Sequence, residues 1–388
     1  FYFICTMEHI KQCETMRTVL LGDDFLLAKI FLQTVDTTEE KDKNAIRGIV
    51  AILTYEDKFD QCFGELLEQE LRENDINAGI LRGSTPCTRL VTEYLRMHHS
   101  FLVNIANRSL QKVLKKGKCF EINPMLVDGD HRINKKVHSL LSAAKHVFDS
   151  IIKTPIPDSI CQLCKTISRV LKENKIPLPP IAVSKGGDPY DSFTVSNTFF
   201  LHFLCPFLVT LPEDLAGYKH ANRTVVLFAK LFQALANGSL FDVEWMQPCN
   251  TFIEENRQAY ETFCDKIINP KRKCELFSLP SRLTTSSEVN MVNRWKAMYR
   301  WIKGNQELLV NKIEDPSDKE KIKNQLDKMF KEVAHVRAET SEHIPCRLRS
   351  QPPKGRKGST GSFNGKSRSR SGAGGKDEGR RKSLYGGL

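Results

Sequence analysis

Apolar residues recur at helical spacing along most of this chain. One face of residues 56–72 collects Phe59, Cys62, Phe63, Leu66, Leu67 and Leu71, and residues 137–152 show the same period. The spacing predicts further helices over 8–34, 43–54, 85–115, 157–173, 191–209, 222–241, 249–267, 287–303 and 317–337. The two-residue alternation of half-buried strands is absent. The pattern therefore predicts an all-α protein without internal repeats.

Turn-rich segments separate these helices, and the composition changes near residue 345. KTPIPDS (153–159) and PLPPIAVSKGGDPYDS (177–192) are rich in residues that end helices. From residue 345 onward Gly, Ser, Lys and Arg dominate, and such a segment cannot bury enough apolar surface to fold alone. We therefore expect a helical domain over residues 1–344, followed by a disordered basic tail over residues 345–388.

The positive charge is concentrated in this tail. The chain has a formal net charge of +12, and residues 345–388 hold 12 Lys and Arg against Asp377 and Glu378. The charge therefore does not favour a nucleic-acid partner for the helical domain. An alternative, a protein whose tail binds DNA or RNA, predicts steeply salt-dependent binding that disappears when the tail is deleted. We expect instead that the tail binds anionic membrane lipids of the inner leaflet, and that phosphorylation of Ser383 in RRKS (380–383) weakens this binding.

The 12 cysteines follow no repeating spacing. A chain of this length does not depend on disulfides for its stability, so we expect a reducing compartment and a cytoplasmic location. The basic tail adds the expectation that the chain is recruited to the inner face of the plasma membrane. The one CxxC, Cys161 to Cys164, lies within a helical pattern and has no second CxxC or HxxxH. We interpret it as two buried thiols and predict no metal site.

The most apolar run, FFLHFLCPFLVTL (199–211), is shorter than the roughly 20 residues that span a bilayer, and it contains His202 and Pro206. We interpret it as a buried core helix. The chain opens on Phe1 and shows no signal peptide, so we expect further domains upstream.

Common enzyme motifs are absent: the sequence has no HExxH, no GxSxG and no GxGxxG after a strand. GSFNGKS (361–367) resembles a phosphate-binding loop, but it is one residue short between its glycines and no strand precedes it. We interpret it as a coincidence in a low-complexity segment. The polar side chains in apolar surroundings are more informative.

The first of these side chains is Arg82, in GILRGSTPCTRL (79–90). Ile80 and Leu81 favour burial, Thr85 suits a helix N-cap, and Pro86 suits the first helical position. Arg82 is therefore predicted on a short loop that is anchored on both sides. Such a loop can present a cation to another molecule.

The second set lies on the predicted helix RTVVLFAKLFQALANGSLF (223–241). This helix is apolar over most of its surface but carries Lys230, Gln233 and Asn237 on one stripe. Taken alone, the stripe is most simply the solvated face of an amphipathic helix.

Four segments resemble, in order and rough spacing, the catalytic domain of the Ras GTPase-activating proteins. They are LRGSTPCTRLVTEYL, FEINP (120–124), SNTFFLHFLCPFLVTL (196–211) and VVLFAKLFQALANGSLFDVEWMQPCNTFI (225–253). The resemblance covers about residues 8 to 340. It implies an all-helical, RasGAP-like fold, with a central catalytic part at about 50–270 and an extra helical part from 1–49 and 271–344.

The resemblance also implies a function and a site. The chain would stimulate GTP hydrolysis by a Ras-like small GTPase, of Ras or Rap type, in its GTP-bound state. Arg82 would be the arginine finger, whose planar, always charged guanidinium stabilises the charge on the phosphate oxygens, and Gly83 would allow close approach of the loop. The chain would need no cofactor, because Mg-GTP is bound by the partner.

Other residues match the family's GTPase-binding surface: Leu201, Lys230, Gln233, Asn237 and Glu244. Simpler interpretations remain for three of them, since Leu201 suits the core, Gln233 an internal hydrogen bond and Glu244 a solvated surface.

The chain departs from the family where the triplet FLR reads Phe200, Leu201, His202. In the family this arginine braces the finger loop by donating to its backbone carbonyls. Histidine has at most two ring donors, and losing a charge-assisted hydrogen bond costs about 1.5–3 kcal/mol. We therefore predict a GTPase-activating protein that is weakened about ten- to hundredfold.

Smaller departures are Pro86 and Cys87 after the finger and Phe207 after the proline of the third segment. Together with His202 they leave an alternative: a catalytically poor scaffold or effector that binds GTP-loaded Ras-like proteins. Retention of Arg82 favours catalysis, because a pure binder has little need of it.

Overall fold

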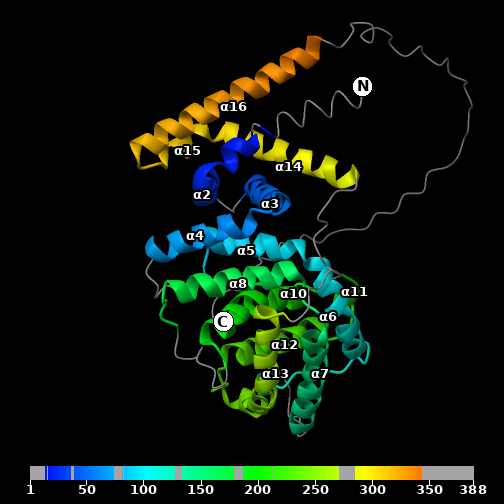
Figure 1. Ribbon diagram of the computed structural model, residues 1–388. Coiled ribbons are helices and arrows are strands. Elements are labelled where there is room, and N and C mark those ends of the chain that lie inside the picture. Colours follow the sequence, from blue (N-terminus) through cyan, green and yellow to red (C-terminus); the bar gives the residue numbers. More distant parts are fainter. Residues whose placement is uncertain are drawn as a thin grey trace, which may run out of the picture. The chain divides into compact units, whose positions relative to one another are not determined.

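The computed structural model describes residues 14, 16–35, 39–73, 81, 83–126, 133–178, 187–211, 213–270 and 285–342 (Figure 1). Within these ranges the regular structure is helical and no strand occurs, which confirms the all-α prediction. The described residues up to Ser341 belong to one compact unit. The predicted tail lies outside the described residues, and the proposed domain boundaries stay predictions.

Helices from the two ends of the described chain pack against each other. The N-terminal elements are the short 3-10 helix η1 (Asp23–Phe25), α2 (Leu26–Thr34) and α3 (Glu40–Tyr55); the C-terminal ones are α14 (Thr285–Gly304), α15 (Gln306–Asn311) and α16 (Pro316–Glu342). α3 lies along α14, and α2 contacts α15 (Figure 1). Trp301 Nε1 donates to the buried Asp42 Oδ1 at 2.6 Å, so this carboxylate is not left unpaired between the helices.

Gly48 of α3 allows the close approach of α14. A Cβ atom at this position would lie 3.2 Å from Cγ of Met298. A larger residue would therefore require the Met298 side chain to shift by a few tenths of an ångström.

The remaining helices carry the segments singled out in the sequence. In chain order they are α4 (Phe59–Glu73), α5 (Pro86–Met97), α6 (His99–Leu114), η3 (Pro124–Leu126), α7 (Ile133–Lys153), α8 (Asp158–Glu173), α9 (Pro189–Val195), η5 (Ser196–Leu204), α10 (Cys205–Val209), α11 (Glu213–Ala216), α12 (Ala221–Asn237), η6 (Glu244–Cys249) and α13 (Asn250–Ile268). η5 contacts α5 on one side and α12 on another, so it connects the segment after Arg82 with the helix of Lys230.

Phenylalanines fix these helices to one another. Phe199 and Phe200 of η5 lie edge-on to Phe263 of α13, with ring centroids 5.2 and 6.2 Å apart, and all three are buried. Phe232 of α12 and Phe252 of α13 are 6.1 Å apart. Each aromatic pair of this kind contributes about 0.5–1.5 kcal/mol of stability beyond the contribution of the apolar area that it buries. η5 and α12 are thus held on a common support, α13.

The helix predicted over 85–115 is wrong in its continuity, because α5 and α6 are separate and His98 lies between them. His98 has φ −95 and ψ 11, its side chain is buried, and its Nε2 lies 3.1 Å from Ser159 Oγ of α8. Similarly, the helix predicted over 8–34 is interrupted before η1. The side-chain pattern continues through such bends, so periodicity alone did not reveal them.

His98 gives a pH-dependent prediction. Burial lowers its pKa to about 4, so the folded state stays unprotonated where the unfolded state, with an ordinary pKa near 6.5, takes up a proton. Stability is therefore lost as the pH falls through this window, by about 3 kcal/mol in total. Urea unfolding should show this loss in the wild type but not in His98→Gln. As the pH falls from neutral to about 4, the free energy of unfolding of His98→Gln should therefore rise by about this amount relative to that of the wild type.

The wild type and His98→Gln must be compared because Asp60 has the opposite effect on the pH dependence of stability. Burial and the nearby Asp57 raise the pKa of Asp60 to about 6, so its proton uptake stabilises the folded state as the pH falls. Asp60 is present in both proteins and cancels in the difference. If the difference in the free energy of unfolding between wild type and His98→Gln stayed constant across this pH range, the pH dependence could not be assigned to His98.

The apolar run and the cysteine pair lie in the core as predicted. Among the described residues, Pro189–Val209 is the stretch long and apolar enough to cross a membrane, and 72% of its apolar window is buried inside the protein. Cys161 and Cys164 are both buried, and burial raises the pKa of the Cys164 thiol. No group of His, Cys, Asp and Glu suited to a metal ion occurs among the residues that the structure describes.

Candidate functional site

Arg82 lies outside the described residues, so the predicted finger loop is described by the residues on either side of it, Leu81 and Gly83. Leu81 is buried, at 1% exposure, and its φ of 54 is in the left-handed region that few non-glycine residues adopt. Gly83 is exposed with φ 87, and a Cβ there would meet nothing within 4 Å. The chain therefore leaves the core at Leu81 and reaches the surface at Gly83, where glycine is needed for conformation and not for space.

The start of α5 fixes the other end of the loop. Thr85 Oγ1 accepts a hydrogen bond from Thr88 N at 3.2 Å, and Pro86 occupies the first turn, so the predicted cap is confirmed. Glu70 Oε2 of α4 accepts from Cys87 N at 3.2 Å. Two of the amides at this helix N-terminus thus have acceptors, one of them a carboxylate at the positive end of the helix.

η5 is a π-helix, which the sequence analysis did not predict. The amide of Cys205 bonds to the carbonyl of Phe200, five residues back. Pro206 follows, and a proline lacks the amide for the carbonyl four residues earlier and clashes with it in an α-helix; here that carbonyl belongs to His202. The wider turn accommodates this conflict. π-Helical turns within helices are frequent at functional sites, although η5, with nine residues, is longer than a single turn.

His202 of η5 contacts the finger loop directly. Its Nε2 lies 2.6 Å from the carbonyl oxygen of Leu81. Because a carbonyl oxygen only accepts hydrogen bonds, this contact requires the proton on Nε2. The residue that the sequence analysis aligned with the family's bracing arginine therefore lies against the residue that immediately precedes Arg82.

The three polar residues of α12 are half-buried and lie toward the end of the helix. Gln233 Nε2 donates to Asn237 Oδ1 at 3.2 Å, and Ser196 Oγ of η5 donates to the same oxygen at 3.0 Å. Asn237 thus ties the end of α12 to the start of η5. Lys230 has no ion pair or side-chain hydrogen bond within the described ranges.

Leu201 and Glu244 occupy different settings. Leu201 is half-buried on η5, next to His202, so it is not a fully buried core residue. Glu244 is exposed at the start of η6, and the preceding loop is held by Asn250, which accepts from Phe241 N at 2.8 Å and donates to Phe241 O at 3.1 Å. Among the described residues, no hydrogen bond or ion pair joins Glu244 to the polar stripe of α12.

Glu121, in the FEINP segment, connects to the other end of α12. It forms an ion pair with Arg223 in which Nη2 is 3.0 Å from Oε1, and it accepts from Asn123 N at 2.9 Å. Burial acts to raise the pKa of Glu121, but the bonds from Arg223 and the backbone outweigh it and the pKa is lowered. The second segment of the resemblance is thereby joined through a charged pair to the start of α12, two residues before the fourth segment begins.

The structure brings some of the predicted site residues together and leaves others apart. His202 meets the loop of Arg82, and Gln233 meets Asn237, whereas Lys230 and Glu244 make no such contact among the described residues. The sequence analysis missed Ser196 and Glu70. Ser196 lies inside a recognised segment, but nothing in the sequence signals that its hydroxyl reaches Asn237, and Glu70 lies in no recognised segment.

Comparison with known protein families gives one match. Residues 128–237 match the RasGAP family model, described as GTPase-activator protein for Ras-like GTPase. The matched range contains η5 and α12, begins after Arg82 and ends before Glu244. No curated protein matches the chain in a sequence search. A domain of this kind interacts with Ras-like GTPases and activates their GTP hydrolysis, and residues 128–237 of this chain are similar to part of it.

Proposed function

We propose that this chain activates a Ras-like GTPase by inserting Arg82 into the active site of the partner in its GTP-bound state. The observation that carries the proposal is the contact of His202 Nε2 with Leu81 O, because it fixes the residue before Arg82 to the π-helix of the family match. An arginine supplied in trans stabilises charge on the phosphate oxygens as the terminal phosphate is transferred to water. Mg-GTP and the attacking water belong to the partner.

The remaining site residues then act by binding and positioning. Leu201, Lys230, Gln233 and Asn237 line the surface that receives the partner, with Glu244 at its edge. The bonds of Asn237 to Gln233 and Ser196 keep this surface rigid, so less side-chain freedom is lost on association. Gly83 permits close approach of the loop backbone to the GTPase.

We further propose that activation is weaker than the family's arginine brace would give. A histidine, with at most two ring donors, stands where a guanidinium fork would offer up to five, and one of its contacts is with Leu81 O. The loop of Arg82 then spends a smaller fraction of time in the reactive geometry. This lowers the rate of hydrolysis in the complex more than it lowers the affinity of the complex.

Single-turnover GTP hydrolysis by a Ras-type and a Rap-type GTPase, with and without the full chain, tests the function. We expect an acceleration that saturates with the concentration of the chain for at least one of the two, and binding that prefers the GTP-bound over the GDP-bound form. Neither acceleration nor nucleotide-dependent binding would contradict the assignment. Binding without acceleration would instead support the scaffold or effector alternative, which the replacement of the brace by His202 favours.

The cellular location is part of the proposal. We place the chain in the cytoplasm, at the inner face of the plasma membrane, because Ras-like partners and anionic lipids meet there and residues 345–388 are strongly basic.

A further inference from the structure

A second surface feature lies away from the finger loop, between the end of α6 and the face of α7. It is a pocket of about 640 Å³, a size common for small-molecule sites. Its floor is apolar and firmly held: Phe120 and Val113 are buried, and the Phe120 ring is 6.3 Å from that of Phe228 in α12. A preformed floor of this kind favours a defined ligand.

The walls of this pocket carry cations without counter-charges. Lys112 and Lys116 come from the end of α6, Lys118 from the segment after it, and His138 and His146 from α7. No Asp or Glu lines the pocket. None of the three lysines has an ion pair within the described ranges, and all three are exposed and free to turn toward a ligand.

Ordinary helix stabilisation accounts for only part of this arrangement. Cations in the last turn of a helix interact favourably with its dipole, which suits Lys112 and Lys116. Lys118 lies beyond the helix, however, and the two histidines belong to the middle of a different one. The three lysines lie near one another with no carboxylate among the lining residues, so they repel one another and a bound anion would relieve that repulsion.

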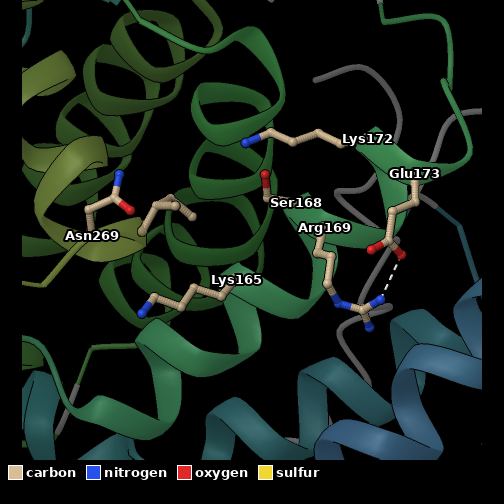
Figure 2. A pocket seen from close by; sticks show the side chains of 7 residues that line it. Lys165, Ser168, Arg169, Lys172, Glu173 and Asn269 are labelled. Carbon is tan, nitrogen blue, oxygen red and sulfur yellow. Dashed lines mark hydrogen bonds and ion pairs between the residues drawn. The ribbon is translucent and has the colours of Figure 1, made fainter.

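Another pocket of the protein shows the opposite arrangement. It is lined by Lys165, Arg169 and Lys172, but Figure 2 shows Arg169 directed to Glu173 on the same helix, at 2.6 Å between Nη1 and Oε2. Lys172 Nζ is 2.9 Å from Asp188 and 2.7 Å from Asp191. Two of its cations are neutralised internally, so this pocket offers less to an external anion.

We propose that the pocket between α6 and α7 binds a small molecule with two or more phosphate groups, of the class of phosphorylated inositols, either free or as a lipid headgroup. Three ammonium groups supply point charges for the phosphate oxygens. The hydroxyls of Ser139 and Ser142 and the histidine rings supply further hydrogen-bond donors. The apolar floor accommodates the ring. This proposal does not depend on GTPase activation, so a test that contradicts one of the two proposals leaves the other unaffected.

Binding measurements with the full chain test the proposal. One arm uses inositol trisphosphate in isothermal titration calorimetry, and the other uses phosphatidylcholine vesicles with and without phosphatidylinositol bisphosphate in a sedimentation assay. In the variant Lys112→Gln/Lys116→Gln/Lys118→Gln we expect binding to weaken by at least about tenfold. Loss in the calorimetric arm supports a site that accepts the free phosphate ester, and loss confined to vesicles supports a lipid headgroup.

A matched control removes the same number of charges elsewhere. Lys312, Lys323 and Lys331 are exposed residues after α15 and on α16, and their replacement by Gln should leave binding in both arms unchanged. Lys118→Glu, outside any helix, provides a second test variant that does not depend on the stability of α6. The tail is identical in all these proteins. Equal loss in the control, or no binding of either probe by the wild type, would overturn the proposal.

Discussion

Arg82→Ala is expected to remove nearly all of the acceleration of GTP hydrolysis, with a loss of about 10³- to 10⁵-fold in the single-turnover rate of the complex. Alanine leaves the loop without the cation that stabilises the developing charge on the phosphate oxygens. The loop itself should persist, because Leu81 stays in the core and Thr85 still caps α5. The measurement is single-turnover hydrolysis at a concentration of the chain that saturates the GTPase.

Two controls separate catalysis from folding and from general charge. Arg82→Lys keeps the positive charge but loses the planar fork, so it should recover only part of the rate. Arg300→Ala removes an exposed arginine of α14 and should leave the rate unchanged. Affinity for the GTP-bound partner should change much less than the rate in every case. A normal rate for Arg82→Ala would exclude Arg82 as the finger.

His202→Arg is expected to raise the rate of hydrolysis in the complex by about ten- to hundredfold. In the structure His202 Nε2 lies 2.6 Å from the carbonyl oxygen of Leu81, next to Arg82. A guanidinium at this position carries more donors and a permanent charge, so it can hold further carbonyls of the loop. His202→Ala should lower the rate below that of the wild type, because it removes the existing bond.

The double variant Arg82→Ala/His202→Arg shows whether the brace acts through the finger. If it does, the arginine at position 202 should bring no gain when Arg82 is absent, which is the non-additivity expected of coupled residues. An equal gain in both backgrounds would mean that residue 202 acts on the partner directly. No gain in either background would mean that His202 already holds the loop as well as an arginine would.

Much of the fold followed from local patterns. The helices of the central segments have strong helical spacing, and the start of α5 was predicted from Thr85 and Pro86 because capping depends on neighbouring residues only. The break at His98 was missed, since it depends on a buried contact with Ser159, 61 residues away. The π-helix was missed because Pro206 within an apolar run predicts a conflict but not how the backbone resolves it.

For the candidate site too, some features follow from the sequence and others only from the tertiary structure. The sequence by itself determined the all-α class, the order of the four family segments and the residue types at Arg82, His202, Gln233 and Asn237. The tertiary structure alone decided that His202 lies against Leu81 and that Ser196 and Gln233 share the oxygen of Asn237. These contacts join residues up to 121 positions apart, and helical periodicity, which reports on each helix separately, carries no information about which faces of distant helices meet.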